Sequence, residues 1–135
     1  MAKKITEIEG IGPATAEKLA AINITNVEGF LKHGADPAGR DEIAEKTGMA
    51  PAKVLAFVNM ADLFRVKGIG SEYAELLQAA GVNTVVELSK RNAANLHTKL
   101  VEVNAEKKLV RQLPSAGTVE AFVERAKELP RVVTY

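Results

Sequence analysis

Apolar residues recur along most of this chain at the three- and four-residue spacing of amphipathic helices, and strand-like alternation never lasts for long. In the first half, this spacing and the turn residues that bound it predict four helices. They cover residues 13–22, a stretch capped by Thr25 or Asn26 that stops near Gly34, residues 37–47, and the segment PAKVLAFVNMADLF from Pro51.

The second half follows the same plan. Helices are predicted over residues 71–80, 84–90, 95–103 and 105–112, with a turn at Gly81, and a last helix begins after Pro114. The tail RVVTY has strand-like composition but no partner strand, so we expect it to be extended. The expected fold is all-α, with roughly five short helices in each half.

Two stretches of the sequence occur twice. IEGIGPATAEKLAAINITNV begins at Ile8 and returns as VKGIGSEYAELLQAAGVNTV from Val66, at an offset of 58 residues. VLAFVNMADLF from Val54 returns as VEAFVERAKEL from Val119, at an offset of 65, so the second copy carries seven extra residues, which we place within LHTKLVEVNAEKKLVRQL. Repetition of this kind indicates repeated structural units. We predict two pseudo-symmetric helical bundles, residues 1–64 and 65–135, packed together as one compact unit.

The composition narrows the class of protein. The 135 residues are 47% hydrophobic, enough for a packed core, and include no cysteine, so disulfides and cysteine-ligated metals are excluded. There is no tryptophan and only 4% of residues are aromatic, which argues against base-stacking platforms for single-stranded nucleic acid. No apolar run approaches the roughly 18 residues of a membrane helix. The start MAKKITEIEG lacks the apolar stretch of a secretory signal, so we expect a cytoplasmic protein.

The repeated segments GIGPATAEKL and GIGSEYAELL resemble the helix-hairpin-helix motif, in which glycines flank an apolar residue in a hairpin between two short helices. Over essentially the whole chain, including VEVNAEKKLVRQLPSAGTVEAFVERAKEL, the sequence also resembles a bacterial family filed as a domain of unknown function. The first resemblance implies a SAM-like helical fold in each half. The second implies a fold without an established activity.

The resemblance implies a way of binding nucleic acid. In DNA-binding helix-hairpin-helix proteins, the hairpin amides hold a backbone phosphate without reading bases, sometimes with a monovalent cation on the hairpin carbonyls. Glycines that allow positive φ, at the positive end of a helix, suit such an anion. The matching residues here are Gly10, Ile11, Gly12, Gly68, Ile69, Gly70 and the adjoining Ser71.

A purely structural hairpin explains the same glycines. In this interpretation, each hairpin is a tight turn, with Ile11 and Ile69 in the core and no ligand. Two departures from the motif favour it, because DNA-binding versions place Lys or Arg two residues after the second glycine. This chain has Ala14 and Glu72 there, and Glu72 repels a phosphate.

Charge is distributed unevenly along the chain, although the net charge is only +1. Residues 1–64 hold seven Lys and Arg against nine Asp and Glu, whereas residues 65–135 hold eleven against eight. If nucleic acid binds, we expect it on the second half, because its affinity depends on cations that face phosphates. The candidate cations are Lys67, Lys90, Arg91, Lys107, Lys108 and Arg111. Ordinary solvated helix faces are the alternative.

Candidate catalytic chemistry is sparse. A position near a helix C-terminus explains His33, and a partly exposed helix position explains His97, although the sequence does not decide whether either binds a metal or haem. No nucleophile-base set, carboxylate pair or phosphate loop has the spacing of a known motif. We therefore expect neither an enzyme nor a resident cofactor, apart from the monovalent cation named above.

Two functions in different classes remain. The first is binding of DNA or RNA backbone without sequence specificity, through the second hairpin and its basic surroundings. The second is a protein-interaction or self-assembly module with purely structural hairpins, which the opposite charges of the two halves favour.

Overall fold

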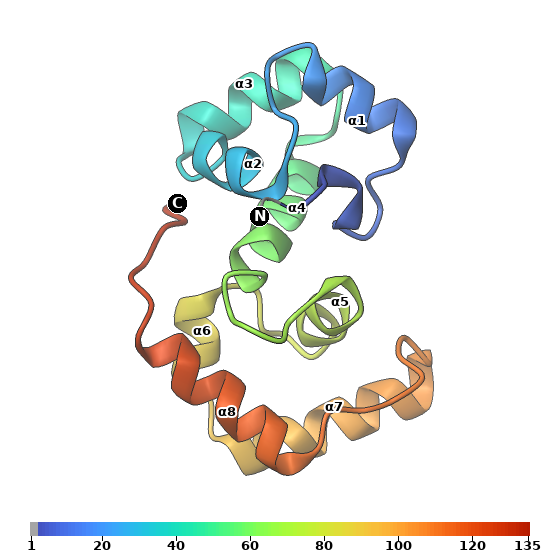
Figure 1. The fold of residues 1–135 in the computed structure, drawn as a ribbon, viewed down its shortest axis with the longest axis vertical. Helices are drawn as coiled ribbons and strands as arrows, with labels where there is room; N and C mark the ends of the chain where they lie inside the picture. Colours follow the sequence, from blue (N-terminus) through green and yellow to red (C-terminus); the bar gives the residue numbers. More distant parts are fainter. Residues whose placement is uncertain (1–2) are drawn as a thin grey trace. The chain divides into compact units, whose positions relative to one another are not determined.

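The computed structural model describes residues 3–135, and this part of the chain is helical, as the hydrophobic spacing predicts (Figure 1). Met1 and Ala2, which begin the segment interpreted above as lacking a secretory signal, lie outside the described residues. The elements in order are η1 Ile5–Glu7, α1 Pro13–Ala20, α2 Val27–His33, α3 Pro37–Thr47, α4 Pro51–Leu63, α5 Ser71–Ala79, α6 Val85–Ser89, α7 Ala93–Lys107 and α8 Ala116–Lys127.

The chain divides into two compact units. Unit 1 comprises Met1–Asp62 together with Val132–Tyr135, and unit 2 comprises Leu63–Arg131. The predicted boundary at residues 64 and 65 lies two residues from this division. The tail groups with unit 1, although it follows unit 2 in the sequence.

Local capping explains where α2 and α3 begin and where α3 ends. The Asn26 side chain accepts a hydrogen bond of 2.7 Å from the Gly29 amide at the start of α2. Asp36 accepts one of 2.7 Å from Gly39 at the start of α3. Gly48, with φ of 75°, ends α3 in the left-handed conformation, so α3 has the predicted bounds 37–47.

Unit 2 uses the same kind of cap. Side-chain oxygens of Thr84, Asn92 and Ser115 accept hydrogen bonds of 3.3, 3.0 and 3.1 Å from amides three residues later, at the starts of α6, α7 and α8. The caps Thr84 and Ser115 lie within two residues of the predicted starts of α6 and α8. The cap Asn92 lies earlier than predicted, so α7 begins ahead of residue 95.

The predicted helix over residues 105–112 is wrong. Helix α7 continues to Lys107 and ends at Lys108, whose φ of 52° is left-handed. Beyond it, the Asn104 side chain accepts a hydrogen bond from the Val110 amide at 3.0 Å and donates one to the Val110 carbonyl at 3.2 Å. The side-chain amide of Asn104 thus holds residues 108–115 in a non-helical loop. Unit 2 therefore has four α-helices instead of the five predicted.

The extra residues of the second half lie near this loop. Helix α7 has 15 residues and its counterpart α3 has 11. The connection that follows α7 covers residues 108–115, whereas the one after α3 covers residues 48–50. Helix α6, with five residues, is two shorter than α2. The difference of seven is therefore the sum of a longer α7 and a longer loop, reduced by a shorter α6.

A phenylalanine ring lies against the first glycine of each Gly-Ile-Gly hairpin. Gly10 has φ of +99°, and a Cβ there would lie 2.8 Å from Cε1 of Phe57. Gly68 has φ of +97°, and a Cβ there would lie 3.0 Å from Cε1 of Phe122. Both rings are buried. These two positions need glycine both for the backbone conformation and for the close approach of the ring.

The second glycine of each hairpin has a different environment. Gly12 and Gly70 have extended backbones, with φ of −91° and −106°, and a Cβ on either would meet nothing within 4 Å. Neither the backbone conformation nor internal packing requires glycine at these positions.

We predict that Gly68→Ala lowers the free energy of unfolding of unit 2 by about 1–3 kcal/mol, because alanine is strained at this positive φ and its methyl group crowds Phe122. The matched variant Gly70→Ala should cost less than about 1 kcal/mol, since it changes only a helix N-cap. Urea denaturation followed by circular dichroism measures both. Equal losses would contradict this assignment of the two glycines.

Candidate nucleic-acid interface

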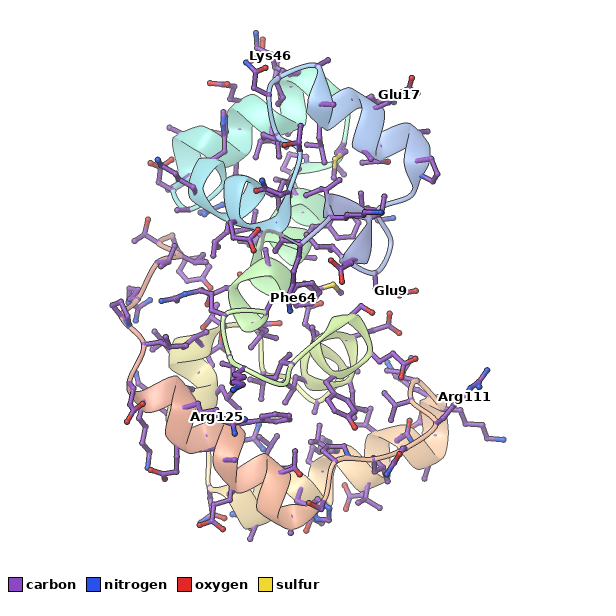
Figure 2. The ribbon with its side chains drawn as sticks, in the orientation of Figure 1. Glu9, Glu17, Lys46, Phe64, Arg111 and Arg125 are labelled. Carbon is purple, nitrogen blue, oxygen red and sulfur yellow. The ribbon has the colours of Figure 1, made fainter. Side chains whose placement is uncertain are left out.

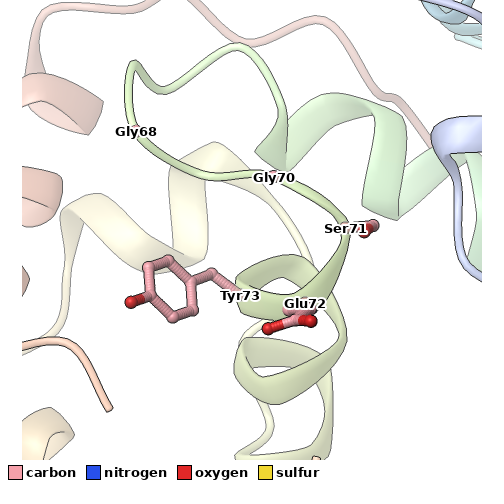
Figure 3. Close-up of a pocket in the computed structure, with 5 residues that line it drawn as sticks. All are labelled: Gly68, Gly70, Ser71, Glu72 and Tyr73. Carbon is pink, nitrogen blue, oxygen red and sulfur yellow. The ribbon is translucent and has the colours of Figure 1, made fainter. Parts of the chain in front are cut away.

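The second hairpin opens directly into a helix. Gly70 is the N-cap of α5, and the first helical hydrogen bond of this turn runs from the Ala74 amide to the Gly70 carbonyl, at 2.9 Å. The amides of the preceding residues lie at the positive end of α5, where helices accept anions. A hollow of about 350 Å³ lies here (Figure 3). Its lining residues are Gly68, Gly70, Ser71, Glu72 and Tyr73.

Tyr73 joins this hairpin to two other parts of unit 2. Its hydroxyl donates a hydrogen bond of 3.1 Å to the carbonyl of Gln112, in the loop held by Asn104. Its ring lies 6.1 Å from that of Phe122, tilted by 57°. The first turn of α5, the loop after α7 and the ring beneath Gly68 are therefore in direct contact.

Arg125 places a cation at the second hairpin. It is not among the cations predicted from the sequence. Its Nη1 donates a hydrogen bond of 2.8 Å to the Lys67 carbonyl and lies 3.5 Å from the position of a Cβ at Gly68. The side chain comes from α8, one turn beyond Phe122 (Figure 2). The offset of 65 between the repeated segments aligns Arg125 with Met60, and this change to a cation was the signal available in the sequence.

The two hairpins differ at three positions that favour an anion at the second, whereas Glu72 in place of Ala14 opposes one there. Exposed Lys67 precedes the second hairpin, and exposed Glu9 stands at the matching position of the first. Pro13 follows Gly12 and removes an amide donor, whereas Ser71 follows Gly70 and keeps it. Met60 also stands in place of Arg125. At these three positions the first hairpin therefore has less positive charge and one amide donor fewer than the second.

The structure brings only part of the predicted set together. Lys67, Gly68, Ile69, Gly70 and Ser71 form one hairpin with Arg125. Lys107, Lys108 and Arg111 are exposed around the end of α7, and Figure 2 shows Arg111 far from Arg125 within unit 2. Lys90, at the end of α6, is exposed, and its neighbour Arg91 is half-buried.

The central isoleucine of each hairpin points into the core. Ile11 is 3% exposed and Ile69 is 1% exposed. Their side chains therefore hold the hairpins to the units. Their amides donate to the carbonyls of Ile8 and Val66 at 3.0 and 3.1 Å, so neither amide is available to an anion. Glu72, whose carboxylate repels phosphate, is exposed and lines the hollow.

The histidines do not form part of this interface. His33 lies at the end of α2, with Nε2 3.0 Å from Oε1 of Glu42, and His97 lies on α7. Over residues 3–135, no three His, Cys, Asp or Glu side chains gather in a way that could hold a metal ion. Within the same residues, no helix combines the length and apolar character needed to cross a membrane.

The fold and the hairpins define an all-helical protein with two units, each of which opens a helix on a glycine turn above a phenylalanine. Comparison with protein families shows that the chain belongs to the family described as domain of unknown function (DUF4332), which matches residues 9–129. No solved structure matches it.

Proposed function

We propose that unit 2 binds the sugar-phosphate backbone of duplex DNA, without reading sequence, through the second hairpin. The observation that carries this proposal is the position of Arg125 beside Lys67 and Gly68. The hairpin lacks the cation expected two residues after Gly70, and Arg125 supplies one from a different helix.

Two cations beside the hairpin support an anion there, although the charged residue that lines the hollow is Glu72. Lys67 directly precedes Gly68, and Arg125 bonds the Lys67 carbonyl. Arg125 uses Nη1 to bond the Lys67 carbonyl, which orients the planar guanidinium, and the rest of its donor fork suits a phosphate. The amides at the start of α5 add donors without adding charge.

Backbone recognition of this kind carries no base preference, since phosphate contacts position a protein without reporting sequence. Tyr73 does not offer a stacking surface for bases, because its hydroxyl donates to the Gln112 carbonyl and its ring lies near that of Phe122. A monovalent cation on the hairpin, which the helix-hairpin-helix resemblance implies, would share the Lys67 carbonyl with Arg125. We therefore expect Arg125 to provide the positive charge at this position.

We predict that Gly70→Glu severely weakens binding of a short DNA duplex, because it places a second carboxylate in the hollow at a position with open space around it. The matched control is Gly12→Glu, which makes the same change in equally open space at the first hairpin and should leave binding near that of the wild type. A gel-shift titration repeated over a range of salt concentrations measures both. Absence of wild-type binding at low salt would exclude the proposed function.

We further predict that Arg125→Met lowers the slope of log affinity against log salt by about 0.9, the amount that one lost phosphate contact removes. Lys127→Gln is the control, because it removes the same charge from the same helix while its Nζ pairs with Glu124 at 2.9 Å. Fluorescence anisotropy with a labelled duplex gives both slopes. If the two variants behave alike, Arg125 contributes only to net charge.

A protein-interaction or self-assembly module is the second candidate function. Unit 1 has seven Lys and Arg against nine Asp and Glu, and unit 2 has eleven against eight, since no charged residue lies in 63–64 or 132–135. Opposite net charges favour contact between the acidic unit of one copy and the basic unit of another. Size-exclusion chromatography with light scattering tests this candidate, and a monomer at all concentrations that captures no partner would exclude it.

A further inference from the structure

The last residues of the chain leave the unit that precedes them. Helix α8 ends at Lys127, residues 128–131 still belong to unit 2, and Val132–Tyr135 belong to unit 1. The Arg65 guanidinium donates a hydrogen bond of 2.7 Å to the Pro130 carbonyl, which holds the chain to unit 2 just before it leaves. The tail is thus a short ligand of unit 1 tethered to unit 2.

The tail is bound to unit 1 mainly through its main chain. The Thr134 amide donates a hydrogen bond of 2.8 Å to the Ala35 carbonyl, in the connection between α2 and α3. Val133 is 1% exposed and provides an apolar anchor. Recognition by main-chain hydrogen bonds and one buried side chain is how proteins bind extended peptides.

A buried guanidinium lies where the tail contacts unit 1. Arg40 is 8% exposed, and its Nη1 donates to the carbonyls of Gly34 at 2.9 Å and Ala35 at 3.1 Å. Its Nη2 donates to the Thr134 carbonyl at 2.6 Å, and its Cζ lies 5.8 Å from the centre of the Tyr135 ring. The bonds to Gly34 and Ala35 orient the guanidinium within unit 1, so the tail meets a donor already in place. We call this position the Arg40 site.

We propose that two copies of this chain associate by exchanging residues 132–135, so that the tail of each copy occupies the Arg40 site of the other. The contacts are the same whichever copy supplies the tail, so exchange conserves them. Reciprocal exchange closes a dimer and leaves no free site, which distinguishes it from an open head-to-tail chain.

Two features of the chain favour exchange between copies. The connection over residues 128–131 has only four residues between the end of α8 and the part of the tail in unit 1, and short hinge loops invite exchange between copies. Exchange also brings the basic unit 2 of one copy to the acidic unit 1 of the other, where their net charges attract. The inference rests on the assembly function given above as the second candidate, and it names the segment that joins the copies.

The absence of native cysteine permits a direct test. Ala35→Cys and Thr134→Cys are made in separate copies, which are purified, mixed at high concentration and oxidised. The Thr134 amide nitrogen lies 2.8 Å from the Ala35 carbonyl oxygen, so backbone geometry keeps the two Cα atoms within about 6.7 Å, inside the range of a disulfide. Exchange predicts a disulfide-linked dimer of the two variants on a non-reducing gel. Ala105→Cys, at an exposed position of α7, replaces Ala35→Cys in the matched control and should give no dimer above background.

A variant that carries both Ala35→Cys and Thr134→Cys in one chain completes the test. If it oxidises within single chains while the mixture gives no dimer above the control, the tail binds only its own unit 1 and exchange is wrong. If neither the double variant nor the mixture forms the disulfide, the tail does not occupy the Arg40 site and exchange is again wrong. Light scattering of the wild type separates the two proposals. A dimer without the specific cross-link retains assembly and excludes exchange, whereas a strict monomer excludes both.

Discussion

The contact between Phe122 and Gly68 is the constraint on which the rest of unit 2 depends. The ring occupies the space that a side chain at residue 68 would need, and the backbone turns there through a positive φ, so both conditions require glycine. Ile69 is buried directly after that turn, and α5 begins two residues later. Since Arg125 lies one turn beyond Phe122 on α8, the packing that shapes the hairpin also places a guanidinium on its Lys67 carbonyl.

Unit 1 has the corresponding contact between Phe57 and Gly10, so the two hairpins are built alike and differ in chemistry. Glu9 replaces Lys67, and Met60 replaces Arg125. Arg125 also lies 3.5 Å from the position of a Cβ at Gly68, whereas Met60 is buried in the core of unit 1. The contact between ring and glycine is therefore kept in both units while the charge beside the hairpin differs, and this separates the packing role of the hairpin from any binding role.

Arg40 shows a different use of a cation. It is buried among main-chain carbonyls, where every hydrogen bond offsets the cost of removing charge from water. Because Thr134 supplies one of those carbonyls, unit 1 includes four residues that follow unit 2 in the sequence. A unit completed by a distant segment can obtain that segment from its own chain or from a second copy, and its stability then depends on protein concentration.

The sequence by itself determined the helical class and most helix ends, because caps such as Asp36 and stops such as Gly48 act within one helical turn. The helix predicted from the sequence over residues 105–112 is wrong. There the Asn104 side chain bonds the main chain six residues later and ends the helix, although the apolar spacing is helical. Only the tertiary structure decided that Arg125 meets Lys67, 58 residues away, and that Thr134 meets Ala35, 99 residues away. Such contacts arise where segments far apart in the sequence pack together, and neither propensity nor periodicity encodes which distant residue arrives at a given turn.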